Sequence, residues 1–222
     1  YTVLSTDPDP LENTVTVSAE DRDGASLLVT DTHSTAIGYA PALTLLKQGP
    51  NMAQIGETVI YTFTVAYDDA NGDGSPVQIL TVNDDVAGEG IYLSGDNGDG
   101  WLQAGETWIY TASHTISVSD PDPLENTVTV TAEDRDGASL LVTDTHSTAI
   151  GYAPALTLLK QGPNMAQIGE AVIYTFTVAY DNVNGDGSSI SDLSVSDDIA
   201  GDATHVGGDA NQNDLIEVDE TW

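Results

Sequence analysis

The chain has no cysteine and very few basic residues. The absence of Cys among its 222 residues excludes disulfide bonds, thiolate zinc sites and cysteine nucleophiles. Only four Lys and Arg residues stand against 36 Asp and Glu residues, which gives a formal net charge of -32. This charge repels nucleic acid phosphates and anionic membrane surfaces. The sequence therefore predicts cations as counterparts, with no nucleic-acid binding and no membrane insertion.

Long apolar runs and catalytic motifs are also missing. No segment of 18 apolar residues could span a membrane, and there is no HExxH motif, nucleophile elbow or phosphate-cradling loop. Carboxylates are abundant, but they lie in Gly- and Asn-rich turns, whereas a glycosidase needs two of them in one cleft. We therefore expect no catalytic residues and no enzymatic activity.

A long internal repeat dominates what is present. Residues 7–68 recur as residues 120–181, at an offset of 113, and the two copies differ only at Ser18/Thr131 and Thr58/Ala171. The copies diverge after residue 68. Repeats this similar are typical of tandem arrays of one structural unit.

Each repeat of about 113 residues has the pattern of β-strands and turns. Apolar residues alternate with polar ones between Gly, Pro, Asp and Asn clusters, and no amphipathic helix of useful length is evident. Seven short strands are expected, over residues 42–47, 57–67, 77–82, 90–93, 107–116, 126–132 and 139–150. This spacing predicts an all-β protein built of antiparallel β-sandwiches.

Prolines mark the domain boundaries. Pro41 and Pro154 precede the first strand of each copy, because proline cannot join a central ladder. Residues 41–153 then form one whole sandwich, residues 1–40 the last two strands of a preceding one, and residues 154–222 the first five strands of a following one. The chain is then either a window of a longer repeat protein or a subunit completed by strand exchange with its own copies.

The segment from Asp209 to Glu220 resembles a calcium-binding loop. Such a loop needs oxygen ligands at alternate positions, a left-handed residue at position six, a carbonyl at seven and a glutamate at twelve. Asp214 stands at position six, where glycine is usual, but Asp adopts that conformation more readily than most residues. The predicted ligands are Asp209, Asn211, Asn213, the Leu215 carbonyl and Glu220.

The first copy has a contracted version of the same loop, one residue shorter. Gly100 occupies the turn, and the predicted ligands are Asp96, Asn97, Asp99, the Trp101 carbonyl and Glu106. Two copies that differ in sequence but keep the ligand types favour bound Ca²⁺ over a plain β-turn.

A second pair of loops supplies further candidate ligands. An Asn-Gly-Asp-Gly hairpin turn explains this pattern equally well, so both interpretations remain open. The candidates are Asp68, Asp69, Asn71 and Asp73 in the first copy and Asp181, Asn184 and Asp186 in the second.

The chain resembles the immunoglobulin-like conserved-repeat domains found in tandem in bacterial and archaeal surface proteins. The resemblance covers nearly the whole chain and rests on the segments "PALTLLKQGP", "GETVIYTFTVAYDDANGDG", "NGDGWLQAGETWIYT" and "NTVTVTAEDRDGASLLVTDT". It implies tandem immunoglobulin-like sandwiches in cell-surface stalks, adhesins or fibres.

Lys47 and Lys160, the only lysines, lie on the first strand of each copy. Surface sandwiches of other families use such a lysine to form an isopeptide bond with Asn or Asp beside a buried carboxylate. The sequence identifies no partner for this reaction. The alternative is an exposed lysine that discourages pairing at a sheet edge.

These features predict a structural component of an extracellular filament or cell-surface stalk. Its partners are expected to be copies of itself, and calcium is expected to hold together loops that otherwise repel. The alternative is an adhesin that binds a glycan or protein, which an exposed aromatic patch or a groove would favour.

Overall fold

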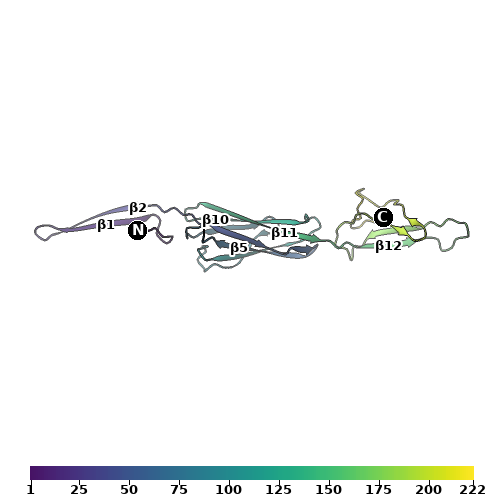
Figure 1. Ribbon diagram of the computed structural model, residues 1–222, viewed down its shortest axis with the longest axis horizontal. Coiled ribbons are helices and arrows are strands. Elements are labelled where there is room, and N and C mark those ends of the chain that lie inside the picture. The colour runs from purple at the N-terminus through teal and green to yellow at the C-terminus, as the bar shows by residue number, and fades with distance from the viewer. The chain divides into compact units, whose positions relative to one another are not determined.

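The computed structural model describes residues 1–222, and the chain is all-β (Figure 1). It contains no helix, and so none that could cross a membrane. The longer strands are β1 (Leu11–Glu20), β2 (Ser26–Thr35), β3 (Leu43–Gln48), β5 (Thr58–Tyr67), β6 (Gln78–Asp84), β8 (Ile91–Ser94), β9 (Thr107–Thr115), β10 (Leu124–Glu133), β11 (Ser139–Gly151), β12 (Leu156–Gln161) and β13 (Thr175–Tyr180). The short strands are β4 (Met52–Gln54), β7 (Gly88–Glu89), β14 (Ser196–Asp197) and β15 (Gly201–Asp202).

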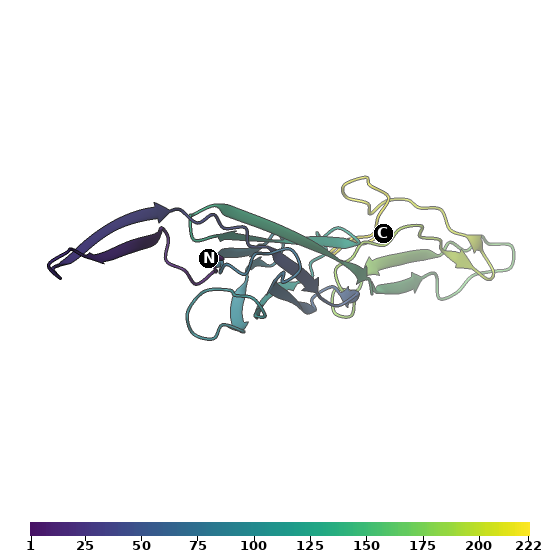
Figure 2. The same cartoon turned by 60° about the vertical axis from the view of Figure 1, so that its left-hand side comes forward.

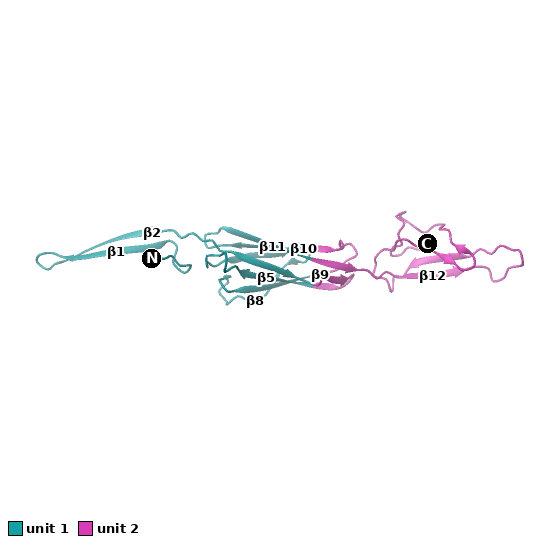
Figure 3. Ribbon diagram, viewed as in Figure 1, with its two compact units in different colours: residues 1–49, 60–113, 126–146 teal, residues 50–59, 114–125, 147–222 magenta.

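By its internal contacts the chain divides into two compact units (Figure 3). The first comprises Tyr1–Gly49, Ile60–Ser113 and Asn126–His146. The second comprises Pro50–Val59, His114–Glu125 and Ser147–Trp222.

The strands between residues 43 and 151 form two sheets, which is consistent with a β-sandwich. One sheet has the order β3-β5-β9-β8 and the other the order β4-β11-β10-β6-β7. All seven strands expected in this region are present, and β3 and β12 begin two residues after Pro41 and Pro154, as predicted. The expectation of a wholly antiparallel fold is wrong for one pair, because the short strand β4 runs parallel to β11.

The core of the first unit forms where strands from both sheets turn alternate residues inward. Tyr61, Phe63 and Val65 of β5 are fully buried, as are Val128 and Val130 of β10. Period-two alternation places these side chains on one face of each strand. β-branched and aromatic residues suit such half-buried strands, which is why the sequence pattern located them correctly.

The N-terminal residues form a separate two-stranded hairpin in which β1 and β2 pair over their whole length (Figure 2). Their sequence is nearly identical to that of β10 and β11. In contrast to those strands, every residue of β2 is exposed, and so is every residue of β1 except Leu11.

The second unit contains the start of the second repeat. β12 pairs with β13 in the same register as β3 with β5, so that Lys160 faces Phe176 as Lys47 faces Phe63. A small core of Val178, Tyr180 and Ile216 is buried there. Beyond β13 only the two-residue strands β14 and β15 form, so residues 154–222 hold fewer regular strands than the five expected.

Candidate functional site

The loop from Asp209 to Glu220 has a left-handed residue at position six, as its sequence predicts. Asp214 at position six has a φ of 60°, in the left-handed region. Asp209 Oδ2 accepts a hydrogen bond from the Asp214 N–H at 3.0 Å. Ile216 is fully buried and forms an isolated antiparallel bridge with Ile190. Glu220 Oε1 accepts from the Ala210 N–H at 3.2 Å, so the last residue of the loop returns to its beginning.

Backbone donors favour the ionised form of Asp209, the first predicted ligand of this loop. Desolvation opposes the charge on Asp209, but the N–H groups of Asp214, Gln212 and Asn213 outweigh it and lower the pKa of this carboxyl. Asn211 Oδ1 and Asn213 Oδ1 accept from N–H groups two residues further on. A carboxylate held in this form is the species that a hard cation binds.

The contracted loop from Asp96 to Glu106 has a related geometry. Gly100 takes the left-handed conformation with a φ of 78°. Asp96 accepts from the N–H groups of Gly98, Asp99 and Gly100, and Leu102 forms the bridge with Val77 that Ile216 forms with Ile190. Asn97 and Trp101 lie within the same turn.

In the loop from Asp96 to Glu106, the carboxylates accept hydrogen bonds from residues of the same loop. Asp99 accepts from the Trp101 N–H at 2.9 Å and from the Gln103 side chain. Glu106 Oε2 accepts from the Gln103 N–H at 3.1 Å. Nowhere in the chain do three or more His, Asp or Glu side chains converge on one point in a group that could hold a metal ion. The loop at 209–220 needs no such group, because only two of its five predicted ligands are carboxylates.

The second pair of candidate loops consists of hydrogen-bonded turns in both copies. Asp68 accepts from the N–H groups of Ala70 and Asn71 and from the Asn71 amide. Asp73 Oδ1 accepts from Ser75, and its Oδ2 accepts from the Ala40 N–H at 2.8 Å.

The second copy repeats these contacts at Asp181, Asn184 and Asp186. This geometry agrees with the turn interpretation. Asp69 is the exception, since its Oδ1 accepts from the Gly105 N–H and so lies beside the 96–106 loop.

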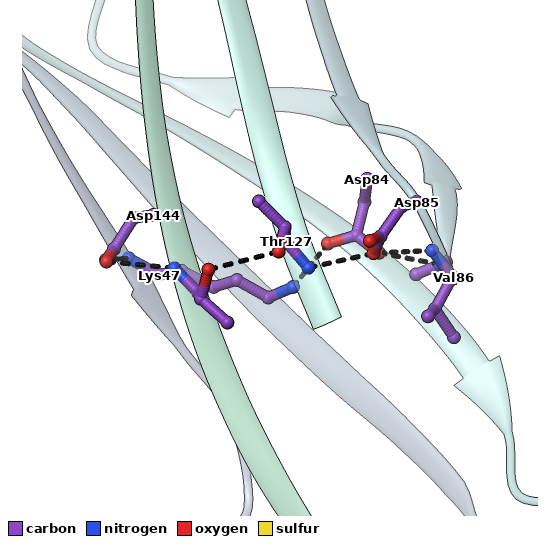
Figure 4. A network of polar contacts seen from close by, with 8 residues as sticks. Lys47, Asp84, Asp85, Val86, Thr127 and Asp144 are labelled. Atoms are coloured by element: carbon purple, nitrogen blue, oxygen red, sulfur yellow. Dashed lines mark hydrogen bonds and ion pairs between the residues drawn. The ribbon is translucent and has the colours of Figure 1, made fainter. Parts of the chain in front are cut away.

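A buried ion pair lies in the first unit and includes the lysine that the sequence placed on the first strand of the repeat. Lys47 Nζ is 2.6 Å from Asp84 Oδ2, and both side chains have no exposed surface (Figure 4). The Lys47 N–H also donates to Asp144 Oδ2 of β11 at 2.6 Å. The interpretation of Lys47 as an exposed edge lysine is therefore wrong: its side chain points inward from β3, because Lys47 follows the inward alternation of that strand.

The second copy has the same pair in a more open setting. Lys160 Nζ contacts Asp197 Oδ2, but 44% of the Lys160 side chain is exposed. The hydrogen bond that Lys160 donates to Asp197 raises the pKa of Lys160 and lowers the pKa of Asp197 to about 2. For Lys47, in contrast, burial lowers the pKa although Asp84 opposes the change. Asp84 and Asp197 each follow their lysine by 37 residues, a repeated spacing that could have identified them in the sequence.

An open cavity lies in the second unit. Its volume is about 690 Å³, and its walls include Tyr174, Phe176, Val178, Leu193, Val195 and Trp222. The residues equivalent to Tyr174 and Phe176 are Tyr61 and Phe63, which are fully buried. The cavity therefore lies where the core of the first repeat is filled.

The comparisons with known proteins give no family for this chain. No model of a known protein family matches it, and no curated protein matches its sequence. The candidate sites therefore depend on their own geometry.

Proposed function

We propose that this protein is a structural component of an extracellular filament or cell-surface stalk, in which the β1–β2 hairpin of one copy completes residues 154–222 of another. The observation that carries this proposal is the presence in one chain of a hairpin with an exposed core face and of a repeat with an open core. The surface assignment is supported by the acidic repeat composition and the calcium-type loops.

The hairpin already has the conformation of its buried counterpart. The Thr14 and Thr32 hydroxyls are 2.8 Å apart, and the equivalent hydroxyls of Thr127 and Thr145 are 3.0 Å apart. The turn is also the same. The Ala25 N–H donates to Asp21 at 2.8 Å in the hairpin, and the Ala138 N–H donates to Asp134 at 2.8 Å in its counterpart. A strand pair that needs little rearrangement loses little entropy when it binds.

The exposed face of the hairpin is the face that its counterpart buries. Val15 and Val17 are 58% and 59% exposed, whereas the equivalent Val128 and Val130 are fully buried. In the whole repeat, Asp144 of β11 accepts from the Lys47 N–H. Asp31 of a second chain would accept a hydrogen bond from the Lys160 N–H in the same way. This equivalence supports a second chain of the same protein, and not an arbitrary apolar surface, as the partner of the hairpin.

Assembly is tested with one variant on each face of the hairpin. We expect Val17→Asp to abolish concentration-dependent multimers, because it would place an unpaired charge in the completed core. Thr16→Asp is the control, since the equivalent Thr129 is only half-buried. Light scattering and electron microscopy of the full chain provide the measurement. A wild-type chain that stays monomeric when concentrated, or a Val17→Asp chain that assembles normally, would contradict the proposal.

Calcium is the second part of this proposal. In the loop at 209–220 it would be held by Asp209, Asn211, Asn213, the Leu215 carbonyl and Glu220, and it would neutralise carboxylates that otherwise repel. In both loops the carboxylates now accept hydrogen bonds from nearby N–H groups, as Glu106 does from Gln103 and Glu220 from Glu217, and they would have to turn toward the ion. The 209–220 loop keeps the full twelve-residue ligand spacing and so fits calcium better.

Chelation provides the test of calcium binding. At ten times the dissociation constant, calcium stabilises a site by about 1.4 kcal/mol, so EDTA should lower the melting temperature by several degrees. Glu220→Gln should remove this calcium dependence from residues 154–222. Glu125→Gln, at an exposed position outside the loops, should leave it unchanged. A melting temperature that is the same in excess EDTA and in millimolar calcium would exclude structural ions.

An adhesin is the second candidate function. A groove of about 500 Å³ in the first unit is lined by residues that include Leu80, Ile91, Tyr92 and Tyr110. Aromatic rings in an apolar groove can stack against a sugar or hold a protein side chain. The groove favours an adhesin only in addition to assembly, because it does not account for the exposed hairpin.

A further inference from the structure

Asn126 is a buried polar residue with no partner. It lies on β10 with no exposed surface, and neither its amide nitrogen Nδ2 nor its oxygen Oδ1 has a hydrogen-bond partner. Buried amides are nearly always hydrogen-bonded, because losing contact with water without replacement is unfavourable. An amide left unsatisfied at both ends therefore requires an explanation.

The strand register places Asn126 close to Asp84. Val128 of β10 is directly opposite Asp84 of β6. Asn126 lies two residues earlier on the same inward face of β10. It is therefore the diagonal neighbour of Asp84, a position at which Cα atoms lie roughly 7 Å apart. The pairing continues past the end of β6, since the Asp85 N–H donates to the Thr127 carbonyl and the Thr127 N–H donates to Asp85 (Figure 4).

Lys47 reaches the same place from the opposite sheet. Its Nζ atom is 2.6 Å from Asp84 Oδ2, and it lies 4.7 Å from the centre of the Tyr61 ring and 5.7 Å from that of Phe63. An amine, a carboxylate and an amide are thus brought together, with two aromatic rings against the amine.

We propose that Lys47 and Asn126 become joined by an intramolecular isopeptide bond, with Asp84 as the group that transfers the proton. This bond would account for the unsatisfied amide, because Asn126 would be a reactant and not a hydrogen-bonding residue. It would also link β3 to β10, and so one sheet to the other, in a chain that has no cysteine.

The reaction balances without any other reagent. The Lys47 ammonium gives a proton to the Asp84 carboxylate, and the neutral Nζ then attacks the Asn126 carbonyl carbon Cγ. Asp84 passes its proton to Nδ2, taking up the second Nζ proton in turn. The Cγ–Nδ2 bond breaks and an Nζ–Cγ amide remains. The departing ammonia takes the proton that Asp84 accepted from Nζ and leaves as ammonium, which restores the Asp84 carboxylate. No atom is oxidised or reduced.

Burial supplies the reactivity that the amine needs. Desolvation lowers the pKa of Lys47, which increases the fraction of neutral, nucleophilic amine. Lys160, in the second unit, pairs with the equivalent carboxylate, Asp197, but its pKa is raised. A filled core thus favours the reaction, and no asparagine equivalent to Asn126 lies between residues 154 and 222.

Intact-mass spectrometry of the denatured full chain tests the proposal. We expect the mass to be lower than that of the sequence by about 17 Da, the mass of one ammonia. Proteolysis should yield a branched peptide in which Lys47 is joined to Asn126. A wild-type chain with the full sequence mass and no branched peptide would overturn the proposal, and this test requires no variant to fold.

Two variants separate the reaction from simple packing. Asp84→Asn keeps both reactants and the shape of the third residue, so the mass loss should disappear and the melting temperature should fall by about 10 °C. Asn13→Ala, at the exposed equivalent of Asn126, should retain the loss within the chain. An Asp84→Asn chain that still loses about 17 Da would exclude the role assigned to Asp84.

Discussion

Phe63→Ala is expected to destabilise its repeat by about 3–5 kcal/mol, whereas the same change at Phe176 should cost less than about 2 kcal/mol. Phe63 of β5 is fully buried. Phe176 has the same sequence neighbours, but it is only half-buried and lines the open cavity. The two substitutions are chemically identical, so their difference measures what the last two strands of a repeat contribute to the core.

Hydrogen exchange in increasing urea, followed by mass spectrometry of peptides, measures the stability of residues 41–153 and of residues 154–222 separately. The chain should be dilute enough to prevent assembly. Under assembling conditions, Phe176→Ala should approach the cost of Phe63→Ala, because the hairpin of a second copy would then cover it. Equal costs in the dilute chain would show that residues 154–222 are packed as well as the first repeat.

Assembled chains are expected to give a ladder of covalent multimers on a denaturing gel, at multiples of 23.2 kDa. This prediction depends on both the assembly proposal and the isopeptide proposal. Asn13 of the hairpin is the equivalent of Asn126, and Lys160 with Asp197 is the equivalent of Lys47 with Asp84. A docked hairpin would bury Lys160, lower its pKa and place Asn13 beside it, so an amide that survives boiling in detergent would form between copies.

The variants for this experiment distinguish the two proposals. Lys160→Arg keeps the positive charge but cannot form the bond, so it should abolish the ladder while multimers persist in native solution. Lys47→Arg should leave the ladder intact and remove only the mass loss within the chain. A single denatured band from assembled wild-type chains would contradict the bond between copies, and the intact-mass test would still decide the bond within one copy.

The two loops with predicted calcium ligands show where sequence reasoning succeeded and where it was insufficient. The left-handed conformation at Asp214 follows from local chemistry, because Asp adopts that region more readily than most residues. Gln212 and Asp219 of the same loop are left-handed as well, which the sequence pattern did not predict. Whether Asp99 and Glu106 point to a shared centre depends on their side-chain rotamers. In the loop at 96–106 both carboxylates accept hydrogen bonds from neighbouring N–H groups, which the residue spacing did not predict.

The buried lysine shows a different limit. A lysine on a first strand is most often exposed, and the sequence identified no partner for it. Asp84 and Asn126 are 37 and 79 residues further along the chain, and only the register of β6 with β10 shows that they are neighbours. The sequence pattern places residues on one face of a strand, but it does not show which strands pair.

The sequence alone determined the repeat, the strand positions and the all-β class, because alternation and turn residues act over a few neighbouring positions. Only the tertiary structure decided which identical segments are buried. β1 and β10 differ at a single position, Ser18 in place of Thr131, yet one is exposed and the other lies in the core. The physical reason is that the burial of a strand depends on the strands that pack against it. The same valines are core residues only where a second sheet covers them.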